Sequence, residues 1–165
     1  MPIYKLRIVS DKLCESASVK ATNPKETVRY LLDHCFPPEE AWRERVVAVF
    51  TNRALEVTGH IEVATGGTAS TCIDIKVIAK AALDTLAEGV ILAHNHPSGP
   101  CTPSNADIEI TRKIKSGLST LQIKLIDHII LGNKEYFSFN EERTIAMPET
   151  KQDSQRHPRT LLNHE

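Results

Sequence analysis

Two histidines and an aspartate form the clearest candidate for a reactive site. His94 and His96 lie two residues apart, directly after the apolar run 90–93, and Asp107 follows near the start of an expected helix. In an extended chain, side chains two residues apart point to the same side, so both imidazoles can bind one ion. Two imidazoles and one carboxylate leave the fourth position of a tetrahedral zinc ion open to water, which is typical of catalytic zinc. Such a water ionises near neutral pH and attacks carbonyls, so the pattern predicts a zinc-dependent hydrolase.

Each of these residues also has a purely structural explanation. A lone buried histidine is more often a core residue than a ligand, and Ser104-x-x-Asp107 is also the pattern of a helix capping box. Capping and metal binding are compatible for Asp107, because a residue in the first helical turn can also face the preceding loop. The metal site is favoured by the order of the features: a strand, two histidines, a loop with prolines and glycine, and an acid at a helix start.

The elements that would position these side chains follow from hydrophobic periodicity. Residues 90–93 predict a short buried strand, and 94–100 predict an irregular loop at its end, where functional residues tend to lie. Ser104 opens the next expected helix, whose inner face comprises Ile108, Thr111, Ile114, Leu118 and Leu121. The site is therefore expected between a strand end and a helix start.

Two further helices and five further strands are expected. Asn23 and Pro24 predict the start of a helix that ends before Pro37. A helix from Cys72 onward, which Gly89 would end, has an apolar face of Ile75, Ile78, Ala79, Ala82 and Leu86. The strands are an edge strand at 3–9, a hairpin of 45–50 and 55–64 with a turn at 52–53, and two closing strands, 123–131 and 135–139, around a turn at 132–133.

The motif residues resemble a known family. His94-x-His96-Pro97, followed by Ser104 and Asp107, matches the motif H-x-H-P-x6-S-x-x-D of the JAMM, or MPN-plus, metalloproteases at every position.

A longer set of residues is similar to the bacterial RadC branch of these proteins. It comprises the string ILAHNHPSG at 91–99, Thr111, the string LIDH at 125–128 and Ser138-Phe139, and the resemblance extends over about residues 40–142. It implies an α/β fold of the α+β type, in which helices flank a curved, mostly antiparallel sheet, as in the JAB/MPN (cytidine-deaminase-like) architecture.

The resemblance also implies roles for individual residues. His94, His96 and Asp107 would bind zinc, and Ser104 would help to hold the oxyanion. A glutamate that leads into the first core strand would act as general acid and base, and Glu44 occupies that place.

Glu62, in the second strand of the hairpin, is the reserve candidate for the general base. In the wider family the substrate is often a lysine isopeptide or the C-terminal peptide of a ubiquitin-like protein, but no residue here identifies a partner. His128 matches a family string, and either a structural role or a role beside the site is open. Cys101 follows the histidine loop, where a thiol could cap the metal, although a bystander cysteine is the simpler interpretation.

Three segments are expected along the chain. Residues 1–39 form an N-terminal extension with one helix, 40–146 form the metal-binding domain, and the polar segment 147–165 forms a disordered tail. Many RadC-like proteins also carry a helix-hairpin-helix module that contacts DNA, and its glycine hairpin is not found in residues 1–39. We therefore do not expect DNA binding through such a module.

Composition favours a soluble cytoplasmic protein with no membrane contact. The 165 residues contain 20 Lys and Arg and 21 Asp and Glu, so no overall positive field attracts nucleic acid. Arg112, Lys113 and Lys115 cluster on one helix, which is typical of a solvated face. The four cysteines are isolated, and no apolar run approaches the roughly 20 residues of a membrane span.

Two other functions remain open beside the zinc peptidase or isopeptidase. A DNA-repair or DNA-processing role follows the historical association of RadC, although the contiguous string His94-Asn95-His96 matches the HNH nucleases only by coincidence. A non-enzymatic scaffold is the third interpretation, because some members of the wider superfamily have lost their metal ligands. All three ligands and the serine are present here, which favours the enzyme.

Overall fold

Seven strands form one sheet in which every neighbouring pair is antiparallel except β4 and β5. The computed structural model describes residues 7–8, 19–66 and 73–148, and the sheet order is β1-β3-β2-β4-β5-β6-β7. The strands are β1 (Arg7–Ile8), β2 (Arg45–Thr51), β3 (Val57–Thr65), β4 (Gly89–Asn95), β5 (Lys124–Leu131), β6 (Glu135–Ser138) and β7 (Arg143–Ala146).

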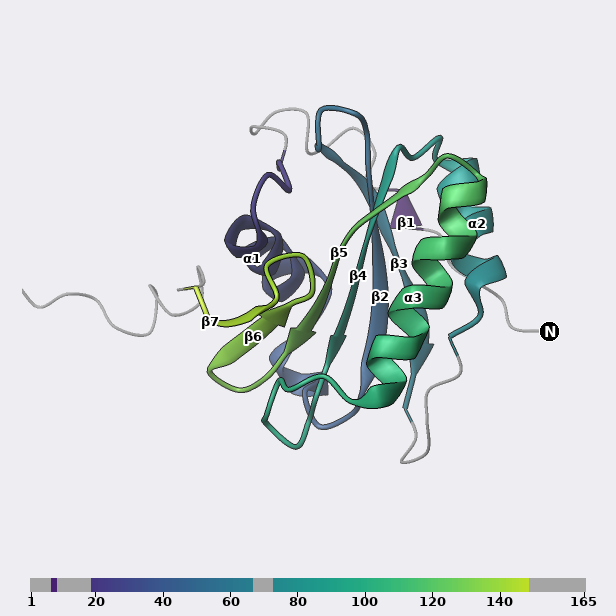
Figure 1. Cartoon of the computed structure of the whole chain (residues 1–165). Helices are drawn as coiled ribbons and strands as arrows, with labels where there is room; N and C mark the ends of the chain where they lie inside the picture. Colours follow the sequence, from purple (N-terminus) through teal and green to yellow (C-terminus); the bar gives the residue numbers. More distant parts are fainter. Residues whose placement is uncertain (1–6, 9–18, 67–72, 149–165) are drawn as a thin grey trace, which may run out of the picture.

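Helices cover both faces of this sheet. α1 (Pro24–His34) lies on one face, and α2 (Ile75–Asp84) and α3 (Asn105–Thr120) lie on the other, as Figure 1 shows. A short 3-10 helix, η1 (Pro38–Glu40), connects α1 to β2. A mostly antiparallel sheet flanked by helices confirms the predicted fold class. In the described residues, no helix is both long enough and apolar enough to cross a membrane.

The central strands divide their side chains between two apolar cores. Odd-numbered residues of β2 and β4 pack toward α1: Val47, Val49, Ile91 and Ala93. Even-numbered residues pack toward α2 and α3: Val46, Ala48, Phe50, Val90 and Leu92. Since strand residues alternate between faces, His94 and His96 continue the even series and lie on the face of α3.

The N-terminal helix shares the first of these cores. Asn23 caps α1, because its side chain accepts a hydrogen bond from the main-chain N–H of Glu26, and Pro24 begins the helix as predicted. Val28 and Leu31 of α1 are fully buried in the core that also contains Val47. The division of the chain at residue 40 stays a prediction, and the helix before it packs on the sheet.

The helix after Cys72 ends earlier than periodicity predicted. α2 ends at Asp84, and Leu86 has a φ of 49° and an exposed fraction of 86%, so it is not part of the inner face. The chain turns there in the left-handed conformation, and the main-chain N–H of Ala87 closes the turn on the carbonyl of Ala82. Gly89 does not end the helix but begins β4, where a Cβ would lie 2.4 Å from the Ile126 side chain.

Other boundaries differ by a few residues. β4 runs through Asn95, so the loop begins at His96 rather than His94, and Leu121 lies after α3 with an exposed fraction of 41%. β7 was not predicted, because four residues with one partly buried apolar side chain carry little periodicity. Strand structure is confirmed at residues 7–8 of the predicted edge strand, and nearly all of the predicted disordered tail lies outside the described residues.

The loop after the histidines is braced by the turn between β5 and β6. The main-chain N–H of His96 donates to the carbonyl of Leu131 (2.9 Å), and that of Asn133 donates to the carbonyl of Gly99 (3.1 Å). The turn includes Gly132 as predicted, and a Cβ there would lie 2.3 Å from the Gly99 oxygen. The loop therefore rests on a turn with no space for a side chain at Gly132.

We expect Gly132→Ala to lower the free energy of unfolding by about 3 kcal/mol, because main-chain atoms must move to admit the methyl group. Urea unfolding followed by circular dichroism measures this. Gly66→Ala is the control: its Cβ would meet no atom of the described residues within 4 Å, and its φ of 76° imposes only backbone strain, about 1 kcal/mol. Equal losses in the two variants would show that the contact between turn and loop is not tight.

Candidate metal centre

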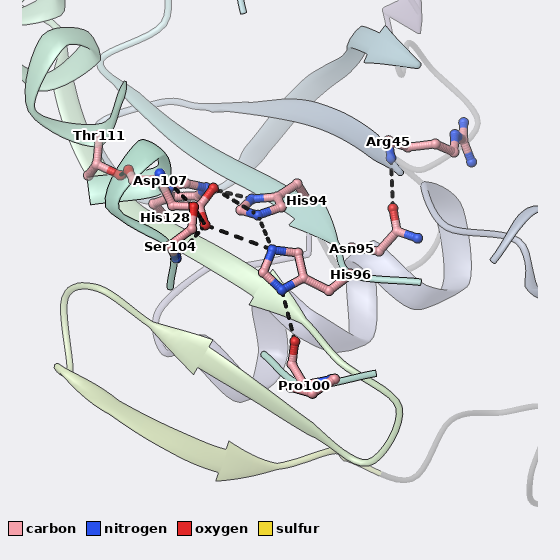
Figure 2. A network of polar contacts seen from close by, with 9 residues as sticks. All are labelled: Arg45, His94, Asn95, His96, Pro100, Ser104, Asp107, Thr111 and His128. Carbon is pink, nitrogen blue, oxygen red and sulfur yellow. Dashed lines mark hydrogen bonds and ion pairs between the residues drawn. The ribbon is translucent and has the colours of Figure 1, made fainter. Parts of the chain in front are cut away.

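The three predicted ligands lie together at the end of β4. Their ligand atoms all lie within 4.8 Å of one another, and among the described residues this is the only group of its kind. His94 Nε2 is 2.9 Å from His96 Nε2 and 3.3 Å from Asp107 Oδ1, as Figure 2 shows. His94 is buried, and the other two residues are half-buried. The group of three side chains is therefore open to solvent on the side of His96 and Asp107.

Asp107 is held by the start of its own helix. The main-chain N–H and the hydroxyl of Ser104 both donate to Asp107 Oδ2, at 2.7 and 2.6 Å, and the N–H of Asp107 donates back to the Ser104 hydroxyl. This is a complete capping box, so the structural interpretation of Ser104 is correct. Oδ1 stays directed at His94, and one carboxylate both caps the helix and faces the imidazoles.

The Asp107 side chain is a carboxylate at neutral pH. Burial raises the pKa of this carboxyl, but its contact with the His94 ring and the hydrogen bonds from Ser104 outweigh burial and hold the pKa well below its usual range. A negative charge is therefore present beside the two imidazoles.

The proton on His96 can be assigned from its surroundings. His96 Nδ1 lies 2.8 Å from the carbonyl oxygen of Pro100 (Figure 2), and a carbonyl only accepts hydrogen bonds. In the neutral ring Nδ1 therefore carries the proton, and Nε2 presents a lone pair to His94 and Asp107. A lone pair beside a carboxylate fits a bound cation, and nitrogen with carboxylate oxygen is the donor set that zinc prefers.

His128 lies behind His94, inside the protein. It is fully buried, its Nε2 is 2.9 Å from His94 Nδ1, and its ring stacks on Phe139 with 4.9 Å between centroids. Burial and the neighbouring His94 lower the pKa of His128 to about 3, so the ring is neutral at physiological pH. His128 thus lies beside the site and contacts one of the candidate ligands, and its role there stays a prediction.

Thr111 contacts the other nitrogen of His128. Its hydroxyl oxygen is 2.6 Å from His128 Nδ1 and 2.5 Å from the carbonyl oxygen of Asp107. The sequence placed Thr111 on the inner face of the helix but assigned it no contact with the site. Its spacing of four residues from Asp107 was the available signal, because such residues lie on one face of a helix.

The two candidate glutamates lie in different positions relative to the histidines. Glu62 pairs with Val47, whose side chain packs toward α1, and its carboxylate forms an ion pair with Arg45. Val46 pairs with His94 across β2 and β4, so continuing this register by two residues puts Glu44 opposite His96. Glu44 is half-buried and directly precedes β2.

Asn95 ties the end of β4 to the segment that contains Glu44. Its Oδ1 accepts from the main-chain N–H of Arg45 (2.8 Å), and its Nδ2 donates to the carbonyl of Arg43 (2.9 Å), as Figure 2 shows in part. Asn95 points away from its two histidine neighbours because strand residues alternate. This role was not predicted from the sequence, since it depends on a partner 50 residues away.

The remaining candidate residues lie outside the group of ligands. Cys101 is buried and forms no disulfide within the described part of the chain, and it is not among the side chains whose ligand atoms lie within 4.8 Å of one another. A role for its thiol stays a hypothesis. His60 accepts or donates a hydrogen bond at Nδ1 with the Tyr30 hydroxyl (2.7 Å), and His34 is exposed. Arg112, Lys113 and Lys115 are all exposed, which confirms a solvated face.

Comparisons with known proteins agree with this geometry. The model of the RadC-like JAB domain family matches residues 21–144, a range that includes all three candidate ligands. The chain is similar to the UPF0758 protein of Flavobacterium johnsoniae, with 40% identity over 106 residues, or 64% of this chain and 44% of the relative. It is also similar to the UPF0758 protein of Fusobacterium nucleatum, with 34% identity over 143 residues, or 87% of this chain and 60% of the relative.

The chain spans about half the length of the curated relatives that it matches. The matched range covers most of the sheet and the three helices, together with the loop and helix start that hold the candidate ligands. The chain belongs to the family of RadC-like JAB domains.

Proposed function

We propose that this protein is a zinc-dependent hydrolase that cleaves a peptide or isopeptide bond. The observation that supports it is the convergence of His94 Nε2, the lone pair of His96 Nε2 and the Asp107 carboxylate within a few ångströms. Electron pairs that face one another repel unless a proton or a metal cation lies between them. Two nitrogens and one carboxylate oxygen, with a further position open to solvent, form the donor set of a catalytic zinc site.

Each residue of the site has a separate role in such a reaction. Zinc held there would act as a Lewis acid that polarises a carbonyl and makes water a nucleophile near neutral pH. Glu44 takes the proton from the attacking water and returns it to the leaving amine. Ser104 orients Asp107, because its single hydroxyl proton is donated to Oδ2. Support of an oxyanion by Ser104 stays a prediction from the family motif.

The position of Glu44 favours it over Glu62 as the general base. Counted along the register of β2 and β4, Glu44 lies opposite His96, whereas Glu62 is engaged by Arg45 and pairs with a residue of the other face. A general base must lie within hydrogen-bonding reach of the proton that it removes, so a carboxylate behind the sheet is a poor candidate.

The nature of the substrate rests on the family motif. A lysine isopeptide or a C-terminal peptide of a ubiquitin-like protein is the class that the JAMM motif implies, while the names of the relatives state no activity. A DNA-processing role has no support from charge, since 20 basic residues face 21 acidic ones. A cytoplasmic location stays a prediction.

The first test is the metal content of the full chain, purified without a histidine tag and measured by mass spectrometry. We expect about one zinc per wild-type chain, loss of zinc in His96→Ala, and retention in His34→Ala, which removes an exposed histidine outside the group of ligands. Well-folded wild type that takes up no zinc when it is supplied would contradict the proposal and favour a scaffold.

The second test compares Glu44→Gln with Glu62→Gln. The probes are a library of quenched fluorescent peptides and a peptide that carries a lysine isopeptide. We expect Glu44→Gln to keep its zinc and lose at least about 100-fold in kcat/KM, while Glu62→Gln stays near wild type. Activity that survives Glu44→Gln would remove Glu44 as the base, and zinc-loaded wild type that cleaves none of the probes would contradict the hydrolase.

The third test separates the two roles of Ser104. We expect Ser104→Ala to lose about 1 kcal/mol of stability through the missing cap and about tenfold in zinc affinity, because Asp107 loses its orientation. Asn23→Ala removes the cap of α1 and should cost similar stability without changing zinc affinity. Both quantities come from urea unfolding and from competition with a chelator, and an unchanged affinity in Ser104→Ala would restrict Ser104 to capping.

A further inference from the structure

A buried chain of hydrogen bonds leads from α3 through β5 to the first metal ligand. Thr111, on α3, contacts His128 Nδ1 at 2.6 Å, and His128 Nε2 contacts His94 Nδ1 at 2.9 Å, as Figure 2 shows. The two ring nitrogens of His128 thus have one partner each. The direction of every proton in this chain can be deduced, beginning from its far end.

The first proton belongs to Thr111. Its hydroxyl lies 2.5 Å from the main-chain carbonyl oxygen of Asp107, four residues earlier in the helix, and a carbonyl has no proton to give. Two oxygens at that distance repel without a proton between them, so the hydroxyl donates to Asp107, a common bond for threonine in helices. Toward His128, the Thr111 oxygen can therefore only accept, and His128 Nδ1 carries a proton.

The second and third protons follow from the first. His128 is fully buried, and the described hydrogen bonds bring no carboxylate to either ring nitrogen, so the ring is neutral with a single N–H. Because that proton is on Nδ1, Nε2 presents a lone pair and accepts from His94. His94 Nδ1 therefore carries a proton, and the second nitrogen of its ring, Nε2, faces His96 and Asp107.

We propose that Thr111 and His128 are positioning residues that hold the proton of His94 on Nδ1, so that Nε2 is kept as the metal ligand. This series of hydrogen bonds begins at the main-chain carbonyl of Asp107 and ends at the His94 ring, which lies beside the carboxylate of Asp107. Two of the three ligands are thus oriented by one closed path of contacts. The importance of this path for metal binding rests on the proposed function, whereas the proton positions do not.

The opposite arrangement would disable the site. If His128 carried its proton on Nε2, it would donate to His94 Nδ1, and the neutral His94 ring would carry its proton on Nε2. That N–H would point at His96 and Asp107 in place of a lone pair. The Thr111 hydroxyl excludes this arrangement. Its proton is already donated to the Asp107 carbonyl, so its oxygen can only accept a hydrogen bond from His128 Nδ1.

The test uses the full chain and three variants. Thr111→Val replaces the hydroxyl with a methyl group of similar shape, and Thr111→Ser restores a hydroxyl. Thr120→Val makes the same substitution on α3 at an exposed threonine whose hydroxyl bonds the Gly117 carbonyl, away from the site. Two quantities are measured: the protonated nitrogen of each ring, by ¹⁵N spectra of histidine-labelled protein without metal at pH 8, and zinc affinity, by competition with a chelator.

We expect wild-type His128 to be protonated on Nδ1. Thr111→Val should lose this preference and bind zinc about 10 to 100 times more weakly, the usual effect of removing a partner of a ligating histidine. Thr111→Ser should restore most of the affinity, and Thr120→Val should match wild type. Loss of affinity in Thr120→Val equal to that in Thr111→Val would reduce the effect to a general weakening of the helix and overturn the proposal.

Wild-type His128 protonated on Nε2 would also overturn the proposal. The ¹⁵N spectrum that detects this requires neither metal nor a folded variant. Unchanged zinc affinity in a folded Thr111→Val would overturn the proposal as well. Failure of the proposed function is distinguishable from these outcomes. Wild type that has the expected protons but binds no zinc would contradict the zinc site and leave the proton chain standing. Wild type that binds zinc but cleaves no amide would contradict only the reaction.

Discussion

The pairing of β4 between β2 and β5 is the constraint on which the rest of the structure depends. Its side chains from Val90 to Ala93 are at most 1% exposed, because α1 covers one face and α2 and α3 cover the other. Burying each large apolar side chain contributes about 1.5–3 kcal/mol, so a shift of register by one residue would be costly. That register directs His94 and His96 toward α3 and Asn95 toward the opposite face.

Burial of His94 makes a hydrogen-bonded network necessary. A buried imidazole without partners costs about 1–3 kcal/mol for each unsatisfied group, and His94, His128 and Thr111 satisfy one another within the protein. Asp127 precedes His128 in β5 and fixes the position of this strand. Its carboxylate accepts hydrogen bonds from the Ser138 hydroxyl and from two main-chain N–H groups. The contacts that stabilise the core therefore also set which nitrogen of His94 is free.

Structural and functional explanations of the same residue turn out to be complementary. Asp107 closes the capping box of α3 with one oxygen and faces His94 with the other. Ser104 is the cap and also the group that fixes the carboxylate. A helix start that directs its first-turn acid toward a strand end needs few additional residues to form a candidate ligand site, since the cap already limits the motion of the carboxylate.

The sequence by itself determined the candidate ligand set and most of the fold. The spacing of His94 and His96, the strand before them and the helix start at Ser104 are local patterns, and this strand and helix form within a few residues of their predicted bounds. The prediction for Leu86 was wrong, because an apolar residue that continues a helical pattern can lie in the turn that follows the helix. The contacts of Asn95 with Arg45, of His128 with His94 and of Gly132 with Gly99 were decided only by the tertiary structure. They join residues that are 33 to 50 positions apart, and such pairs meet only when strands pair, for which a single sequence carries no local signal.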